Sequence, residues 1–568
     1  MKLLPEVKEL IKGERKEIKG YMFILPEGCD QRLATLAKKA PVGNTEVTFE
    51  IGNENSDGYQ IIFGDKIKVN AKGVKGAFYA IQTLRQIAKN GYCDAKEIND
   101  CPDFEVRGFY YDITRGRIPT LESLKRLVDN LAYCKINMLQ LYVEHVFPFK
   151  EYDGIYQRTG YMTAEETREL DKYCQENFIE LVPSLSCFGH LYELLQTEKY
   201  KHLCELPNYE PKTIYWQERM AHHTIDPTNP ESFEIIKSLI DQYLPLFTSD
   251  KFNICCDETF DLGKGRNTGK DAGELYVGFV KKILDYVRSK GKKPMMWGDI
   301  INAHSELIDE LGDTVFLSWG YSENVTPDTI NKLRDAKKTQ YVCPGCNNWT
   351  SLIEMVQVSI PNIYKMTKYG FEAGAKGVLN TCWGDYGHIS PIYACMYSIL
   401  YGASRAWNAQ SEYENYGEAM DLLYYGYEGA SRIVNTLANA YRTCYWYELV
   451  CDYSNRLFNV DLMKAWRTAT PEQLTEAFAE VEEQIPYLMA SRWENEDARE
   501  ALLSVAKGTE IMIAMLMSKQ TGEKMGINDA DAEEWLKEFS KIYLKESKKG
   551  ELSDFVKAMY DLSIRYLK

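Results

Sequence analysis

The chain has 568 residues, a formal net charge of −16 and an aromatic content of 12%, including 40 Tyr and 10 Trp. Its length predicts roughly two to four domains, and its hydrophobic content of 45% is ordinary for a globular protein. The acidic balance excludes nucleic acid and anionic membranes as expected partners, because neither attracts an acidic surface.

The cysteines and the first residues indicate a cellular location. Residues 1–17 carry charges every few positions and no apolar stretch, so we expect no signal peptide. No window reaches about 18 uncharged apolar residues, so we expect no membrane span. The 15 Cys are scattered through apolar segments, as reduced core thiols are, and we therefore expect a cytoplasmic protein. The one CxxC motif, Cys343 to Cys346, lacks a second pair, and we interpret it as structural rather than metal-binding or redox-active.

Residues 1–100 are predicted to form a small α/β domain. Residues 59–63 and 66–69 read as two strands around the turn Gly64-Asp65, which predicts a hairpin. Residues 75–87 place apolar side chains at helical spacing. We therefore expect a sheet with a covering helix.

From residue 106 a short apolar strand, a loop and an amphipathic helix alternate regularly. Eight such units over residues 101–410 fit a (β/α)₈ TIM barrel in number and size. An open doubly wound sheet is the alternative, but no GxGxxG motif follows a predicted strand. The predicted strands are 106–112, 136–143, 178–183, 252–256, 293–297, 315–319, 341–343 and 377–382. The predicted helices are 121–134, 164–177, 230–247, 274–290, 305–311, 327–337, one within 359–373, and 392–406.

Residues 411–568 are predicted to form an α-helical region. The strand pattern stops near residue 413, and helical periods with charged faces continue, for example over 471–490 and 498–519. The predicted fold class is therefore α/β: a TIM barrel with a small N-terminal α/β domain and a C-terminal helical region.

Polar and aromatic residues gather where the predicted barrel strands end. Catalytic groups of such barrels lie at the C-terminal ends of the strands. Trp297, Trp319 and Trp383 each precede a Gly at equivalent strand ends, a regularity that core packing does not require. We expect an aromatic-walled pocket that contains acids and suits a sugar ring. The strand-end candidates are Glu144, His190, Asp257, Glu258, Trp297, Trp319, Asn347, Trp349, Trp383 and Asp385.

Asp257 and Glu258 follow the fourth predicted strand without a spacer. A helix N-cap is the plain interpretation. Conventional glycosidases place two carboxylates on opposite sides of the anomeric carbon, and two neighbouring residues do not easily flank one sugar carbon. The pair suits a mechanism in which the substrate supplies the nucleophile. Glu258 would then protonate the leaving oxygen while Asp257 orients a 2-acetamido group that attacks the anomeric carbon.

The chain resembles glycoside hydrolase family 20, the β-N-acetylhexosaminidases. The resemblance spans roughly residues 55–410, and it implies an exo-acting, retaining enzyme that removes terminal β-linked GlcNAc or GalNAc through an oxazolinium intermediate. The matching segments are RGFYYDITR (107–115), FGH (188–190), Asp257-Glu258, CWGDY (382–386) and the small-domain helix (76–87).

The resemblance also implies roles for the acids. Glu258 would be the general acid/base, with a pKa raised by burial and by the charge of Asp257, which would orient the acetamido group. His190 would hydrogen-bond near the acid and tune its pKa, although a purely structural loop histidine is the alternative.

Further positions would bind the sugar. Arg107 would hold the hydroxyls of the terminal sugar, although an ion pair at the bottom of the barrel is the alternative. Asp385 would take a sugar hydroxyl, and Trp297, Trp319 and Trp383 would wall the acetamido pocket and the sugar face. Glu144, Asn347 and Trp349 are sugar-contact candidates by position only.

One departure from the family is visible. The family has a Tyr after strand seven that donates to the acetamido oxygen, whereas this chain reads PGCNNWT at residues 344–350. The sequence leaves open whether Asn347, Asn348, Tyr321 or Tyr386 replaces that Tyr.

Two other functions remain open on the sequence. One is a β-glycosidase of a non-acetylated sugar with Asp257 or Glu144 as nucleophile, and the other is a glycan-binding barrel without catalysis. The adjacent acids weigh against the second, because a lectin needs no acid beside the acetamido-orienting Asp. No metal cluster, phosphate loop or cofactor fingerprint occurs in the sequence, so we expect no cofactor. The expected partner is an oligosaccharide or glycoconjugate with a terminal β-linked N-acetylhexosamine.

Overall fold

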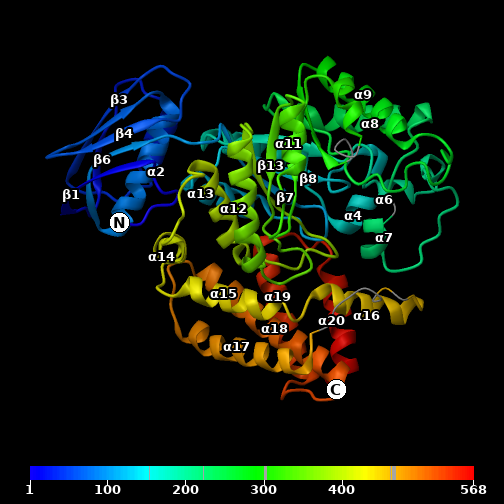
Figure 1. Cartoon of the computed structure of the whole chain (residues 1–568). Coiled ribbons are helices and arrows are strands. Elements are labelled where there is room, and N and C mark those ends of the chain that lie inside the picture. The colour runs from blue at the N-terminus through cyan, green and yellow to red at the C-terminus, as the bar shows by residue number, and fades with distance from the viewer. Residues whose placement is uncertain (153, 222, 300–303, 461, 463–468) are drawn as a thin grey trace.

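The structure is a computed structural model that describes the chain except for residues 153, 222, 300–303, 461 and 463–468. An N-terminal sheet, a central barrel and a C-terminal group of helices follow one another along the chain (Figure 1). The predicted fold class is confirmed.

The N-terminal sheet has six strands in the order β1-β6-β4-β5-β3-β2. β4 and β5 pair antiparallel, which confirms the predicted hairpin. Helix α2 (Val74–Asn90) buries most of its side chains against this sheet, so it is the predicted covering helix. The strands are β1 (Glu9–Glu17), β2 (Tyr21–Ile24), β3 (Thr45–Ile51), β4 (Tyr59–Phe63), β5 (Ile67–Ala71) and β6 (Tyr92–Asp100).

Eight parallel strands close the barrel in the order β7 to β14. Its interior is filled by side chains such as Tyr110, Tyr142 and Met295, and the buried Trp297 and Trp383 belong to the same apolar cluster. That cluster is both the core of the barrel and the floor of its catalytic end. The strands are β7 (Val106–Asp112), β8 (Met138–Val143), β9 (Glu180–Leu185), β10 (Lys251–Asn253), β11 (Lys293–Trp297), β12 (Val315–Trp319), β13 (Gln340–Cys343) and β14 (Gly377–Cys382).

The helices around the barrel follow the predicted order with local differences. Residues 305–311 form a 3₁₀-helix rather than an α-helix. The predicted helix 392–406 is divided into a 3₁₀ turn, η5 (Ile392–Ala394), and an α-helix that begins at Met396. The main outer helices are α3 (Leu121–Tyr133), α5 (Ala164–Glu176), α8 (Pro230–Tyr243), α9 (Ala272–Ser289), η4 (Ser305–Leu311), α11 (Asp328–Asp335), α12 (Val356–Glu372) and α13 (Met396–Trp407).

β10 ends earlier than the predicted strand 252–256. Cys255 and Cys256 have left-handed φ angles of 57° and 63°. The Asn253 side chain accepts a hydrogen bond from the Cys255 N–H at 3.0 Å, which offers the backbone a local alternative to the strand ladder. The chain therefore turns at the rim of the barrel, and Asp257 and Glu258 follow this turn rather than following the strand directly as predicted.

The C-terminal helices pack against one another and against the barrel (Figure 1). α18 is apolar and long enough to cross a membrane by composition alone, but 78% of its most apolar window is buried inside the protein, as in a core helix. The C-terminal elements are α14 (Tyr416–Met420), the π-helix η6 (Asp421–Tyr425), α15 (Ala430–Tyr441), α16 (Trp446–Phe458), α17 (Pro471–Ala490), α18 (Glu496–Thr521), α19 (Asp529–Glu546) and α20 (Leu552–Tyr566).

Candidate active site

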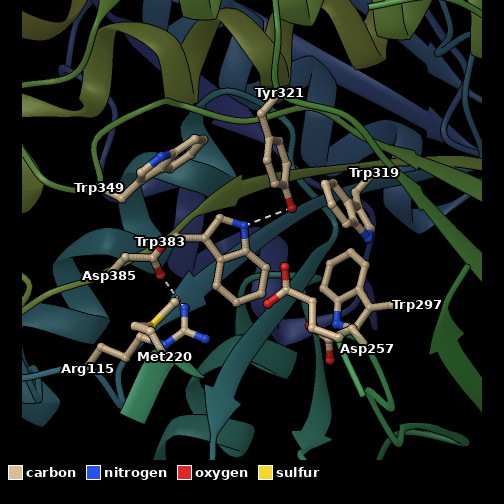
Figure 2. A pocket seen from close by; sticks show the side chains of 10 residues that line it. Arg115, Met220, Asp257, Trp297, Trp319, Tyr321, Trp349, Trp383 and Asp385 are labelled. Atoms are coloured by element: carbon tan, nitrogen blue, oxygen red, sulfur yellow. Dashed lines mark hydrogen bonds and ion pairs between the residues drawn. The ribbon is translucent and has the colours of Figure 1, made fainter. Parts of the chain in front are cut away.

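A cavity opens at the C-terminal end of the barrel strands. Its volume is about 590 Å³ including the open mouth, within the ~300–1,000 Å³ range of small-molecule sites. Figure 2 shows Trp349, Tyr321 and Trp319 along one side of the cavity, the Arg115–Asp385 pair at another, and Asp257 beside Trp297. The lining residues are Arg115, Met220, Asp257, Glu258, Trp297, Trp319, Tyr321, Trp349, Trp383 and Asp385.

Aromatic contacts hold the wall of the cavity in place. The rings of Trp297 and Trp383 lie 5.7 Å apart, centroid to centroid. Trp319 stacks on Tyr321 at 5.1 Å, and Trp349 meets the same tyrosine edge-on at 5.1 Å. Rings that brace one another in this way present fixed faces on which a sugar ring can lie.

His190 joins the two adjacent acids from below. Its Nε2 lies 3.4 Å from Asp257 Oδ2 and 3.4 Å from Glu258 Oε2. Burial lowers the pKa of His190, but Asp257 and Glu258 outweigh burial and raise it to about 10. The imidazole is therefore an imidazolium at neutral pH. Its ring stacks on that of His223 at 4.5 Å, which fixes its plane.

The charge on His190 changes the expected behaviour of the acid. Burial raises the pKa of Glu258, but the hydrogen bond and charge of His190 outweigh it and hold the pKa below its usual value. The predicted upward shift of the Glu258 pKa is therefore wrong. The prediction counted Asp257 and burial and did not include a cation beside the acid.

Asp299 lies behind the acid pair. Its Oδ2 accepts the backbone N–H of Glu258 at 3.2 Å, which helps to hold Glu258 at its left-handed φ of 49°. Burial and the charge of Asp257 raise the pKa of Asp299 to about 7. At pH 7 this carboxyl is therefore only about half ionised, and it adds less negative charge beside the pair than an ordinary aspartate would.

Arg115 provides the cation at the opposite side of the cavity. It forms an ion pair with Asp385, drawn in Figure 2, and its Nη2 lies 3.3 Å from His190 Nδ1. Its Nη1 also lies 3.4 Å from Asp112 Oδ2. A guanidinium beside a carboxylate offers paired donors and acceptors, which suits the vicinal hydroxyls of a sugar.

His190, Asp257 and Glu258 could also hold a metal by distance alone, because their ligand atoms lie within 4.8 Å of one another. A metal ligand must be a neutral imidazole. The raised pKa of His190 keeps its Nε2 protonated, with the charge of the ring facing both carboxylates. The arrangement therefore suits proton transfer better than metal binding.

Models of known protein families match the first two parts of the chain. The glycosyl hydrolase family 20 catalytic domain matches residues 104–345, and domain 2 of the same family matches residues 25–101. Together these matches cover more than half of the chain. The chain belongs to glycosyl hydrolase family 20.

Curated relatives of this family share part of the chain. A β-hexosaminidase of Porphyromonas gingivalis is 26% identical over 274 residues, which are 41% of this chain and 34% of that protein. A β-hexosaminidase of Vibrio furnissii is 22% identical over 373 residues, 56% of this chain and 60% of that protein. The chain thus spans about a third to three fifths of the length of these relatives.

Solved structures share the fold. A chitobiase of Flavobacterium johnsoniae has a TM-score of 0.60 at 16% identity, and the match covers 99% of this chain and 98% of that one. A β-hexosaminidase of Streptomyces plicatus in complex with GlcNAc has a TM-score of 0.58 at 16% identity, covering 77% and 95%. The first likeness extends over the C-terminal helical region as well as the barrel.

The structure brings together most of the residues predicted for the family site. Asp257, Glu258, Trp297, Trp319, Trp349, Trp383 and Asp385 line the cavity. His190 lies directly beneath the two acids, in the position predicted for a residue that tunes the acid.

Arg107 is not at this site, and its predicted role is wrong. It lies buried near the start of β7, and therefore at the opposite end of the parallel barrel. Its Nη2 bonds to Asp57 Oδ2 at 2.7 Å and to the Tyr79 hydroxyl at 3.0 Å, and its Nε bonds to the Lys135 carbonyl at 2.8 Å. The alternative, an ion pair at the bottom of the barrel, describes it correctly. Arg115, just past the C-terminal end of the same strand, occupies the cavity instead.

Glu144 and Asn347 also lie outside the cavity lining, which corrects their prediction as sugar contacts. Glu144 is buried behind the site, where Tyr142 donates to it at 2.8 Å and His190 Nδ1 approaches it at 3.8 Å. It therefore orients His190 and Arg115 from behind. The Asn347 side chain donates to the carbonyl of Gly345 at 3.1 Å.

The structure separates the four candidates for the missing family tyrosine. Tyr321 lines the cavity, and Trp383 Nε1 donates to its hydroxyl at 2.9 Å (Figure 2). The side-chain amides of Asn347 and Asn348 donate to backbone carbonyls, at 3.1 Å and 2.8 Å. Neither amide nor Tyr386 is among the residues that line the cavity.

Sequence reasoning missed Arg115, Met220 and Asp299. The signal for Arg115 was available, because it follows the C-terminal end of the first strand, where barrel catalytic groups lie. Asp299 carried the same signal in the Trp297-Gly298-Asp299 corner. Met220 lies on a seven-residue helix, α7 (Tyr215–Ala221), within the long connection between β9 and α8, and so short a helix left no clear periodic signal in the sequence.

Proposed function

We propose that the protein is a retaining β-N-acetylhexosaminidase that removes terminal β-linked GlcNAc or GalNAc from an oligosaccharide or glycoconjugate. One observation carries the proposal: Asp257 and Glu258, adjacent in sequence, both face an aromatic-walled cavity and both approach one nitrogen of His190. Relatives in the same family that are named β-hexosaminidases support it.

The placement of the two acids favours a nucleophile that belongs to the substrate. A conventional retaining glycosidase uses two carboxyl groups about 5–5.5 Å apart that flank the anomeric carbon. Here one oxygen of each carboxylate lies 3.4 Å from the same His190 nitrogen, and the ligand atoms of the three residues lie within 4.8 Å of one another, so the two acids share one cation and are closer together than a flanking pair. Family 20 is one of the exceptions that use substrate assistance.

In this mechanism Glu258 donates its proton to the glycosidic oxygen as that bond breaks. The acetamido oxygen of the substrate attacks the anomeric carbon and forms an oxazolinium ion. Asp257 accepts the acetamido N–H and stabilises the positive charge that develops on the ring. Glu258, now a carboxylate, removes a proton from the water that opens the ring, so the anomeric configuration is retained.

The other cavity residues would bind two parts of the terminal sugar, its hydroxyls and its acetamido group. Arg115 and Asp385 would bind the hydroxyls of the terminal sugar, the role predicted for Arg107. Tyr321 would donate to the acetamido oxygen. An indole N–H only donates, so the Tyr321 oxygen accepts from Trp383 and its own hydrogen can be directed toward a ligand. A tyrosine after β12 would thus replace the family tyrosine after β13.

Substrate choice tests the proposal directly. The protein should hydrolyse an aryl β-GlcNAc or β-GalNAc, and it should leave aryl β-glucoside and β-galactoside essentially intact. A thiazoline analogue of the oxazolinium ion should inhibit tightly, because it resembles the cyclised intermediate. Turnover of the non-acetylated substrates alone, or no inhibition by the thiazoline, would support the conventional nucleophile instead.

We also propose a cytoplasmic location without nucleic-acid or membrane partners. All 15 cysteines are free thiols in the structure and most are buried, which suits a reducing compartment. Fractionation of the source cells with an antibody against the protein tests this, and recovery outside the cytoplasm would contradict it.

A further inference from the structure

The end of α19 and its connection to α20 (residues 546–551) lie against the loop that follows β7. Pro119 and Ser547 form an antiparallel bridge. The Lys548 N–H donates to the carbonyl of Ile118 at 2.8 Å, and the Thr120 N–H donates to that of Glu546 at 2.9 Å. A segment close to the end of the chain thus extends a loop that begins at the catalytic end of the barrel.

Gly116, the neighbour of Arg115, is held by hydrogen bonds from this C-terminal segment. Its carbonyl accepts the Tyr543 hydroxyl at 2.5 Å and the Glu551 N–H at 3.0 Å. Its φ is +103°, and a Cβ at this position would lie 2.9 Å from Glu551 Oε2. The backbone beside Arg115 therefore has one conformation that only glycine accommodates, and two bonds from the C-terminal region fix it.

The buried Glu551 side chain reaches a second loop of the site. Its Oε1 accepts from Arg219 Nη1 at 2.7 Å, and its Oε2 accepts from Trp216 Nε1 at 2.8 Å. Both partners belong to α7 (Tyr215–Ala221), which also carries the cavity residue Met220. One carboxylate thus joins the loops that supply Arg115 and Met220.

The same connection also holds the loop after β14. Arg117 bonds to the carbonyls of His388 and Ile389 at 3.3 and 3.2 Å, and its Nη1 lies 3.2 Å from Glu546 Oε2. That Oε2 also accepts the Ile392 N–H at 3.3 Å. This loop begins at the corner that carries Asp385, the ion-pair partner of Arg115.

We infer that Tyr543 and Glu551 are positioning residues for the sugar-binding side of the active site, and that the C-terminal helical region is part of that site. The inference rests on the proposed function, because its effect is read through sugar binding. Arg115 would contact hydroxyls that do not react, so its displacement weakens the ground state and the transition state alike. Such a loss raises KM and leaves kcat nearly unchanged.

Tyr543→Phe tests the inference with little risk to folding. We expect KM for an aryl β-GlcNAc to rise about fivefold, the order expected for one hydrogen bond, with kcat within twofold and an unchanged pH profile. Tyr416→Phe is the matched control, because the buried Tyr416 hydroxyl also donates to a backbone carbonyl at 2.5 Å, that of Tyr397. The control should lower Tm to a similar extent and leave KM unchanged.

Glu551→Gln provides the stronger variant. It leaves Arg219 buried without its counter-charge, so folding is checked by circular dichroism and Tm before kinetics. We expect KM in the folded variant to rise more than in Tyr543→Phe, with kcat again the less affected constant. A wild-type KM in both variants, or a KM rise equal to that of Tyr416→Phe, would overturn this inference and leave the proposed function standing. A wild-type protein that does not hydrolyse aryl β-GlcNAc or β-GalNAc would overturn the proposed function and this inference with it.

Discussion

The two ends of the barrel each bury an arginine on or next to β7, and the surroundings of the two guanidinium groups differ. Arg107, at the N-terminal end, bonds to a carboxylate, a hydroxyl and three backbone carbonyls. Arg115, at the catalytic end, faces Asp112, Glu144 and Asp385 at once, and its Nε has no hydrogen-bond partner among the residues that the structure describes. A fully bonded buried charge stabilises a particular packing, whereas a partly bonded one at a cavity is available to a ligand.

The acids at the catalytic end also have incomplete hydrogen bonding. Among the described residues, Asp257 Oδ1 and Asp299 Oδ1 are buried without a hydrogen-bond partner. Unsatisfied buried oxygens are costly, and Asp257 lines the cavity in which an acetamido N–H would lie, with Asp299 directly behind it. The comparison shows that buried polar groups at the N-terminal end of the barrel stabilise the fold, whereas those at the catalytic end are placed to bind a ligand.

Glu258→Gln should have the largest effect at the catalytic end. It removes the proton that a poor leaving group needs, while the acetamido nucleophile and Asp257 remain. We expect kcat on an alkyl β-GlcNAc to fall by roughly 10²–10⁴-fold, and kcat on a dinitrophenyl β-GlcNAc to fall far less because that leaving group needs little protonation. Equal losses on both substrates would contradict the acid role.

Exchanging each arginine for lysine tests the comparison itself. Arg115→Lys should lower kcat/KM by roughly 10- to 100-fold, because lysine cannot reproduce the paired donors, with little change in Tm. Arg107→Lys should instead lower the free energy of unfolding by about 2 kcal/mol or more, because buried acceptors lose their donors. It should leave kcat/KM of the folded enzyme unchanged. Urea unfolding and steady-state kinetics on both variants check this, and the comparison fails if Arg107→Lys is the variant with the lower kcat/KM.

Most of the barrel could be predicted from the sequence, because each strand is a short apolar run next to an amphipathic helix. The end of β10 could not be predicted from the sequence. There the Asn253 side chain accepts a hydrogen bond from the backbone N–H of Cys255, and the strand ends before that residue. Such a side-chain bond leaves no periodic pattern. The 3₁₀ geometry of residues 305–311 was likewise invisible, because helical spacing does not separate the two helix types over so short a segment.

The site was predictable where the strand-end rule applied, and the Trp-Gly corners and the acid pair line the cavity. The rule also explains the error at Arg107, which lies at the start of its strand while Arg115 follows its end. Contacts between segments that are distant in the chain could not be predicted from the sequence. Glu551 and Arg219 are 332 residues apart in the chain, and no local pattern connects them.

His190→Gln tests the charge that distinguishes the catalytic end. The imidazolium, with a pKa raised to about 10 chiefly by Asp257, holds the pKa of Glu258 below its usual value. Removing this cation raises the pKa of Glu258, so the proton needed for catalysis is retained to higher pH. We expect the basic limb of the kcat/KM–pH profile on a poor leaving group to move to higher pH. A limb that stays in place or moves to lower pH would show that His190 does not act through the charge of Glu258.

Glu354→Gln concerns a third environment, a buried carboxyl that has no cation beside it among the residues that the structure describes. Glu354 Oε2 accepts the Ser398 N–H at 2.8 Å, and burial raises the pKa of Glu354 to about 8. A pKa raised on folding makes the folded state bind the proton more tightly, so this stabilisation is complete below the unfolded pKa of about 4.3 and is lost as pH rises to about 8. The glutamine does not ionise. The Tm of Glu354→Gln relative to the wild type should therefore increase by several degrees between pH 5 and pH 8.

The exposed Glu372, on the helix that follows, gives the matched control. Glu372→Gln should keep a constant Tm difference from the wild type across this pH range, because water solvates its carboxylate in both states. If Glu354→Gln showed the same constant difference, the buried carboxyl would have to be solvated or paired in the folded protein. The contrast between satisfied and unsatisfied buried charges would then hold for the two arginines and not extend to this acid.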